Sequence, residues 1–73
     1  MKIQKAINIS SKVQYNRTLY GLTMEELAVA CRVGKSTLYY HLQNPDKLTL
    51  GELKGLSKKL HMPIYELIGE QGN

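Results

Sequence analysis

The feature that most constrains the fold of this chain is a helix-start signal that occurs twice, in LTMEEL and again in LTLGEL. In each, a threonine side chain can accept a hydrogen bond from the first free backbone N–H groups of a helix, and a glutamate three residues later can return the bond. Leucines flank each pair at the spacing of a hydrophobic staple. The capping pairs are Thr23 with Glu26 and Thr49 with Glu52. We therefore expect two helices that begin near Met24 and Leu50.

A third helix start lies between them, at Gly34, with Val33 and Leu38 at staple spacing on either side. Glycine is tolerated at an N-cap, although serine is better. We therefore expect one helix over residues 24–31, a break of three residues, and a second helix over residues 35–43 that stops before Pro45.

The rest of the chain extends this helical pattern. After the second threonine cap, Leu53, Leu56 and Leu60 mark the buried stripe of a helix that runs to about His61. A short last helix follows with Ile64, Leu67 and Ile68, and residues 69–73 are expected to fray. Upstream, Ile9, Val13 and Tyr20 fit a helix ending at Gly21, with a modest capping box at Ser11; Ile3, Ile7 and Ile9 also allow a short strand, which we favour less. The predicted fold is all-α, a single compact bundle of about five short helices spanning residues 1–73.

Charge is distributed unevenly along the 73 residues. The net charge is +4; residues 1–24 carry four basic residues and no acid, whereas residues 25–73 are neutral in sum. A basic balance suits a polyanionic partner, and nucleic acid is favoured over a membrane because no strongly amphipathic basic helix is visible. No apolar run approaches the length of a bilayer span, and no secretory signal is recognisable, so a soluble, cytoplasmic protein is expected. The single cysteine, Cys31, is expected to be a small buried side chain.

The tetrapeptide GKST at residues 34–37 is too short a match to predict a phosphate-binding loop. Such a loop needs a second glycine five residues earlier and a buried strand before it, whereas Val29 stands at that position inside a predicted helix. The segment instead fits two helices joined by a tight turn. Ala28 would allow the two helices to cross closely. The apolar face would hold Leu27, Cys31, Val33, Leu38 and Leu42, with His41 beside it, and Lys35, Ser36, Tyr39, Tyr40 and Gln43 would point away.

Over residues 22–68 the chain resembles the Cro and lambda-repressor-like helix-turn-helix family, also called XRE-type. The matching positions are Leu22-Thr23, Glu26-Leu27-Ala28, Val33, Ser36-Thr37-Leu38, the stripe Leu53, Leu56, Leu60, and Glu66-Leu67-Ile68. The resemblance implies a bundle of about five helices with a recognition helix in the DNA major groove. Three positions depart from the family pattern: Arg32 replaces the turn glycine, Gly34 the capping serine, and Met24 a glutamine that often binds phosphate. At the turn, a residue other than glycine must therefore take a positive φ, so we expect Arg32 to do so.

The resemblance also implies which residues contact DNA. The candidates begin with Gly34 at the helix start, followed by Lys35 and Ser36, which would lie nearest the base edges. Thr37 would lie beside them, and Tyr39, Tyr40 and Gln43 further along the helix. Asn44, Lys47 and the backbone N–H groups of Thr23 and Met24 are candidates for phosphate. Arg17 is a candidate for phosphate or for a salt bridge to Glu26. His41 is expected to be a packed, hydrogen-bonded core residue and His61 a helix cap, so we expect no metal or other cofactor.

The expected function is that of a sequence-specific transcriptional regulator, a repressor in the manner of Cro, which binds a double-stranded DNA operator as a homodimer. Met62, Ile64 and Tyr65 are candidates for the dimer surface, unless they only close the core. The alternative is an antitoxin or another protein-interaction module with the same fold. No paired carboxylates, activated nucleophile or metal cluster indicates an enzyme.

Overall fold

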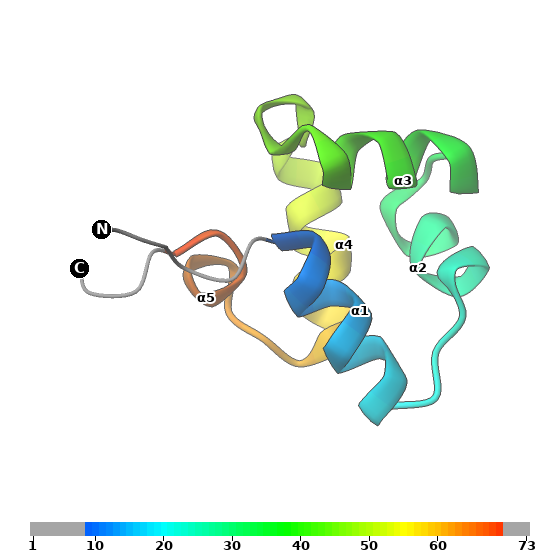
Figure 1. The fold of residues 1–73 in the computed structure, drawn as a ribbon, viewed down its shortest axis with the longest axis vertical. Coiled ribbons are helices and arrows are strands. Elements are labelled where there is room, and N and C mark those ends of the chain that lie inside the picture. The colour runs from blue at the N-terminus through cyan, green and yellow to red at the C-terminus, as the bar shows by residue number, and fades with distance from the viewer. Residues whose placement is uncertain (1–8, 70–73) are drawn as a thin grey trace.

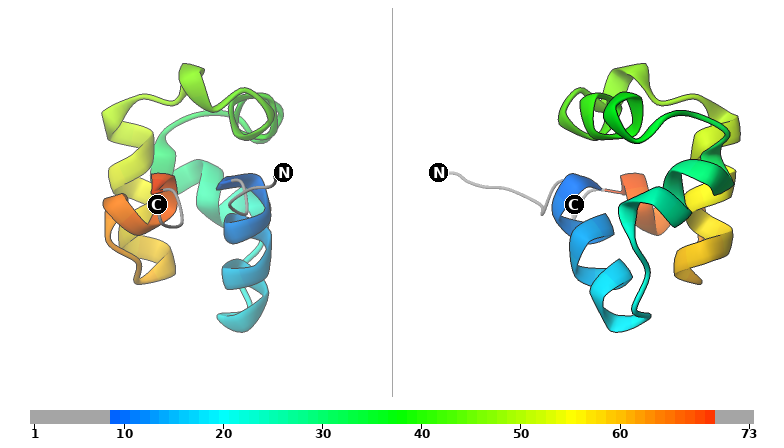
Figure 2. Two further views of the ribbon diagram at one scale, coloured as in Figure 1. Left: turned by 60° about the vertical axis from the view of Figure 1, so that its left-hand side comes forward. Right: turned by 90° about the vertical axis from the view of Figure 1, so that its right-hand side faces the viewer.

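The computed structural model describes residues 9–69, and every regular element in this part of the chain is a helix. Its elements are α1 (Ile9–Leu19), α2 (Met24–Cys31), α3 (Lys35–Gln43), the short 3-10 helix η1 (Pro45–Lys47), α4 (Leu50–Leu60) and α5 (Ile64–Ile68). The predicted all-α bundle of five short helices is confirmed. In Figures 1 and 2, α3 lies across one end of the molecule, and the other helices pack beneath it.

Both threonine capping boxes form as predicted. The Thr23 hydroxyl accepts from the Glu26 N–H at 3.1 Å, and the Glu26 carboxylate accepts from the Thr23 N–H at 2.8 Å. Thr49 and Glu52 repeat this geometry at 3.1 and 3.0 Å. Because these signals are local, the predicted bounds of α2, α3 and α4 agree with the structure to within one residue.

The start of α1 differs from the prediction. The helix already includes Ile9, so Ser11 lies within its first turn and does not cap it. Ile9 is buried against the core, and this burial favours a helix that starts earlier than the serine signal indicates. The helix ends close to the predicted position, where Gly21 adopts a positive φ of 66°. The alternative of an early strand concerned the first ten residues; Ile9 and Ser10 are helical, and residues 1–8 lie outside the described part.

Two helix ends use a left-handed residue that is not glycine. Arg32, at the end of α2, has a φ of 62°, and His61, at the end of α4, has a φ of 56°. Each backbone N–H still donates to a carbonyl in the last turn of its helix, in the manner of a left-handed cap. The predictions that Arg32 takes a positive φ and that His61 caps α4 are both confirmed.

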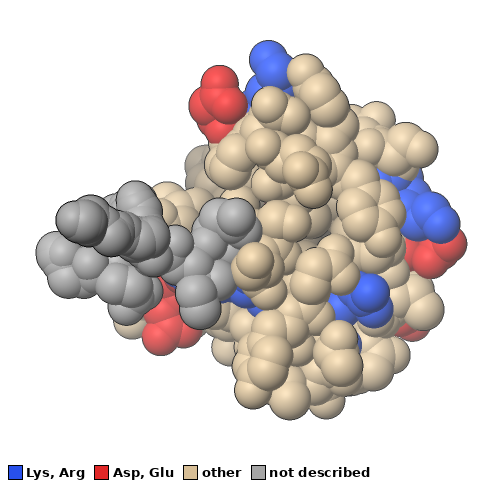
Figure 3. Space-filling model, in the orientation of Figure 1, with Lys and Arg blue, Asp and Glu red and all other residues tan. Residues whose placement is uncertain are grey.

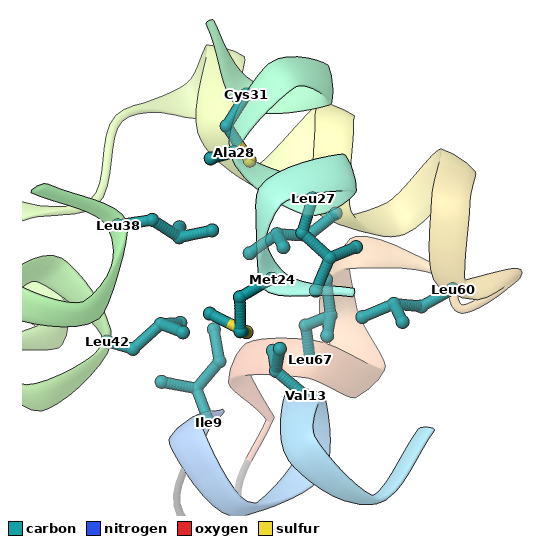
Figure 4. Packing of buried hydrophobic residues seen from close by; sticks show 11 residues of the cluster. Ile9, Val13, Met24, Leu27, Ala28, Cys31, Leu38, Leu42, Leu60 and Leu67 are labelled. Atoms are coloured by element: carbon teal, nitrogen blue, oxygen red, sulfur yellow. The ribbon is translucent and has the colours of Figure 1, made fainter. Parts of the chain in front are cut away.

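The core is a single cluster to which all five α-helices contribute (Figure 4). Its buried members are Ile9, Val13, Met24, Leu27, Ala28, Cys31, Leu38, Leu42, Leu56, Leu60 and Leu67. Helix α4 packs most extensively against α2. At their crossing Gly55 lies so close to α2 that a Cβ atom there would be 2.5 Å from the Ala30 carbonyl oxygen. This close approach of α4 to α2 was not predicted; Ala28 was predicted at the crossing of α2 and α3, and it is buried in the core.

Candidate nucleic-acid interface

Helix α3 divides into a buried side and an exposed side, as predicted. Leu38 and Leu42 are buried in the core. The exposed side chains of the helix are those of Lys35, Ser36, Thr37, Tyr39, Tyr40 and Gln43. Tyr39 is 41% exposed and Tyr40 53% exposed, so neither ring folds back over the core. Two aromatic rings in water on one short helix are costly to maintain, and such rings often mark a binding surface.

The beginning of α3 leaves backbone donors open. Gly34 is the N-cap, with an extended backbone (φ −75°, ψ 159°), and it provides no side-chain hydrogen bond. Helices α2 and α4, by contrast, each have a threonine cap. The first N–H groups of a helix need an acceptor from a side chain, water or a ligand. Those at the start of α3 therefore remain available to an external acceptor.

A hydrogen-bonded contact between a histidine and a buried glutamate connects α3 to α4. His41 Nδ1 lies 2.9 and 3.0 Å from the two carboxylate oxygens of Glu52, and the Glu52 residue is only 3% exposed. The same carboxylate accepts from the Thr49 N–H, so Glu52 caps the start of α4 and binds His41 at the same time. The sequence predicted a packed, hydrogen-bonded His41 but did not identify its partner. The pairing fixes the rotation of α3 about its own axis, and hence which side chains face outward.

An ion pair between α3 and α2 lies at the surface. Lys35 Nζ is 2.8 Å from Glu25 Oε2, and both side chains are largely exposed. The hydrogen bond from Lys35 lowers the pKa of Glu25, and the same bond raises the pKa of Lys35. Sequence reasoning missed this pair because the two residues are ten positions apart on different helices. The only available signal was that each stands in the first turn of its helix.

The predicted phosphate contacts at the start of α2 need correction. The Thr23 N–H is already bonded to the Glu26 carboxylate, so it is not an open donor. The Met24 side chain is buried and accepts a long hydrogen bond from Gln14, which leaves only the Met24 backbone for an outside ligand. Two glutamates in this first turn also oppose an anion there.

The other predicted phosphate ligands differ in their availability. The Asn44 amide donates one N–H to the Tyr40 carbonyl and so caps the end of α3. A side-chain amide has two N–H donors, so a phosphate contact by Asn44 stays a prediction. Lys47 is exposed and makes no ion pair with any residue in the range 9–69. Arg17 does not reach Glu26; its guanidinium donates to the Gln14 side chain and to the Leu22 carbonyl, and it braces the loop between α1 and α2.

The charges around α3 do not merge into one basic patch. In Figure 3, the blue atoms form separate small groups, some next to red atoms, on a surface that is otherwise uncharged. Near α3, the charge of Lys35 is offset by Glu25, and Lys47 follows Asp46 in the chain. Of the six exposed side chains of α3, Lys35 is the one cation, and the other five are uncharged hydrogen-bonding or aromatic groups.

Other kinds of site have little support in residues 9–69. No group of three or more histidine, cysteine or acidic residues in this range could hold a metal ion, and no helix there is long and apolar enough to cross a membrane. Cys31 is buried as predicted. Burial, together with the nearby Glu52 carboxylate, raises the pKa of its thiol from the ordinary 9.0 to about 11, which makes it a poor nucleophile.

Comparisons of the chain with protein-family models, with curated proteins and with solved structures give no significant match. The likeness to the Cro and lambda-repressor-like family therefore stays a prediction from the sequence. The geometry of α3 and its surroundings is what bears on function.

Proposed function

We propose that this protein binds double-stranded DNA in a sequence-specific way, with α3 in the major groove, and acts as a transcriptional repressor. The observation that carries the proposal is the exposed side of α3. Six outward side chains between Lys35 and Gln43 are presented by a helix that two buried leucines and the His41–Glu52 pair hold in a fixed orientation. The major groove is about 12 Å wide and admits one α-helix.

The residue types on this side suit base recognition. Lysine can donate to guanine O6 and N7, glutamine pairs with adenine, and serine and threonine can bond either partner. Lys35 and Ser36 occupy the start of α3, and Gln43 its end, so the helix could read several base pairs. Lys35 must leave Glu25 to do so, and this is feasible because exposed ion pairs contribute little stability.

Contacts to phosphate would fix the docking. The open N–H groups at the start of α3 and the unpaired Lys47 are the best candidates that the corrected geometry leaves. A single module of this kind buries about 600 to 1,000 Å² on DNA, which limits its affinity. We therefore expect two copies to bind a palindromic operator, with half-sites about one helical turn apart. Occupation of such a site would repress by excluding other proteins.

The decisive experiment is selection of binding sites from random duplexes, followed by fluorescence anisotropy on the selected site and on a scrambled duplex at several salt concentrations. Lys35→Ala should weaken binding to the selected site by about 5- to 150-fold and relax one base position. Lys47→Ala, the matched control, should weaken both duplexes alike and reduce the salt dependence by about one ion. Equal losses on both duplexes for Lys35→Ala would refute its base-reading role, and the absence of any enriched site would refute the proposal.

A protein partner on the same surface is the second candidate, as in an antitoxin. The exposed Tyr39 and Tyr40 favour it, since tyrosine is enriched at protein interfaces, and so does the neutralisation of Lys35 by Glu25. The salt series separates the two functions. DNA binding should weaken steeply with salt, whereas an aromatic protein contact should not. Failure to bind any duplex at low ionic strength, with an intact fold, would leave the protein partner as the better assignment.

A further inference from the structure

A second surface lies away from α3, in a hollow of about 690 Å³ between the α1–α2 loop, α2 and α4. In the right-hand view of Figure 2, the end of α1, the loop and the C-terminal half of α4 lie far from α3. Leu22, Ala30 and Gly55 form an apolar floor. The volume is in the range of sites that bind a ligand, or one or two large side chains.

The rim of the hollow is basic and aromatic. Lys58 and Lys59 line it, and no residue in the range 9–69 forms an ion pair with either. Tyr20 and His61 also line it; their rings contact each other in a tilted arrangement, with a centroid distance of 4.9 Å, and join the α1–α2 loop to the end of α4. A neighbouring depression shares Ala30 and Lys59 and is also lined by Val29, which is 76% exposed, and by the acidic Glu25 and Glu26. The basic character is therefore confined to the part of the groove beside Lys58 and Lys59.

The chemistry of this groove selects one kind of occupant. Two unpaired lysines beside an apolar floor complement a segment that carries both carboxylates and a large apolar side chain. A nucleic-acid backbone would use the lysines but would leave the apolar floor exposed. A second copy of this chain is a poor fit, because the chain itself has a net charge of +4.

We propose that the groove binds an acidic, apolar peptide segment of a partner protein, with its aromatic or leucine side chain over Leu22 and Ala30 and its carboxylates on Lys58 and Lys59. The site does not depend on DNA binding by α3, and both surfaces can be occupied together. Such a site would let a protein that binds DNA through α3 recruit, or be removed by, a second protein.

The test uses three synthetic 14-residue peptides and the complete chain. The probe alternates aspartate or glutamate with leucine and phenylalanine at helical spacing; one control replaces the acids by lysine, and the other replaces the apolar residues by alanine. Binding is measured by fluorescence anisotropy and located by amide chemical shifts in nuclear magnetic resonance spectra. We expect the probe to bind at least tenfold more tightly than either control, with shifts at Leu22, Ala30 and Gly55.

Variants on one helix provide the matched comparison. Lys59→Glu should weaken the probe at least tenfold, whereas Lys54→Glu, the same charge change on α4 outside the hollow, should alter it less than threefold. Ala30→Leu, which fills the hollow, should also abolish binding, and circular dichroism must show that each variant is folded. Lys59→Glu should leave the ratio of affinities for the selected and the scrambled duplex unchanged. Failure of the peptide proposal can therefore be distinguished from failure of the DNA proposal.

Several results would overturn the proposal. These are no binding at 1 mM probe, equal binding of the lysine peptide, equal loss with Lys54→Glu, or probe-induced shifts confined to α3. Shifts at the hollow that depend on protein concentration without any peptide would assign it to a second copy instead. Displacement of the probe by a scrambled duplex that shifts the same amides would assign it to nucleic acid.

Discussion

The closest approach of two helices in the structure predicts a large difference between two glycine-to-alanine changes on the same helix. Both Gly51 and Gly55 lie within α4. A Cβ atom at Gly55 would lie 2.5 Å from the Ala30 carbonyl oxygen and 2.9 Å from its carbon, both backbone atoms of α2. A Cβ atom at Gly51 would meet nothing closer than the Thr49 hydroxyl at 3.8 Å, an ordinary contact.

The expected loss of stability in Gly55→Ala follows from the distance by which the two helices must move apart. To bring the nearest contact at Gly55 to 3.4 Å, the α2 and α4 backbones must separate by about 0.9 Å. Overpacking of this kind costs about 1 to 3 kcal/mol. Alanine gains about 0.5 to 1 kcal/mol over glycine in a helix interior, which applies to Gly55. Gly51 is the second residue of α4, where the gain is smaller, so Gly51→Ala should stabilise the protein by at most about 0.5 kcal/mol. The overpacking cost exceeds the gain at Gly55, so Gly55→Ala should be less stable than Gly51→Ala by about 1 to 2 kcal/mol.

Urea denaturation followed by circular dichroism at 222 nm measures the free energy of unfolding of both variants, and equal slopes against urea would show that the unfolded states are comparable. Ala30 and Cys31 directly precede the turn into α3, so Gly55→Ala should also shift amide resonances along α3, whereas Gly51→Ala should not. If the two variants are equally stable and leave α3 alike, the close packing of α2 on α4 is wrong.

Three further predictions concern the charged and titratable residues. Glu25→Gln frees Lys35 and removes an anion near the proposed DNA, so duplex binding at low salt should tighten several-fold in anisotropy titrations; an unchanged affinity would show that the ion pair does not restrain the lysine. Glu52→Ala should cost about 1 to 3 kcal/mol more in urea denaturation than Glu26→Ala, because both remove a capping box but only the buried glutamate leaves a histidine unpaired; equal losses would contradict this. Because the pKa of Cys31 is raised, the contribution of its neutral thiol to stability is complete below pH 9 and is lost as the pH rises toward about 11. The parent protein should therefore lose more free energy of unfolding over this range than Cys31→Ala. Parallel plots of that free energy against pH would show an unperturbed thiol.

Local chemistry explains which parts of the fold could be predicted from the sequence. The bounds of α2 and α4 follow from Thr23 and Thr49, because a capping box involves only residues three positions apart. The exposed side of α3 follows equally from helical spacing around Leu38 and Leu42. The predicted start of α1 was wrong because the burial of Ile9 against other helices outweighed the weak capping signal at Ser11.

Contacts between helices explain what could not be predicted. The partners of Lys35 and His41 stand on other helices, ten and eleven positions away, and no spacing rule connects them. For Arg17, the sequence suggested a DNA phosphate or a glutamate as the partner. Its hydrogen bonds instead go to the Gln14 side chain and to the Leu22 carbonyl, which lies in a loop whose path depends on the fold. In each case the sequence identified a polar residue of interest, but only the packing of the helices identified its partner.

Helix α4 determines the position of the proposed reading surface without belonging to it. Glu52 holds α3 through His41, and the Cys31 thiol of α2 donates to the Glu52 carbonyl at 3.4 Å. Gly55, one turn later, sets how closely α2 approaches. Substitutions at these buried positions should therefore impair DNA binding as severely as changes on the surface of α3, but through the orientation of the helix. A residue can be assigned to base contact only when two conditions hold. Its variant must lose discrimination between selected and scrambled duplexes, and its stability and α3 amide resonances must stay those of the parent. Lys35→Ala should meet both conditions, and Glu52→Ala should not.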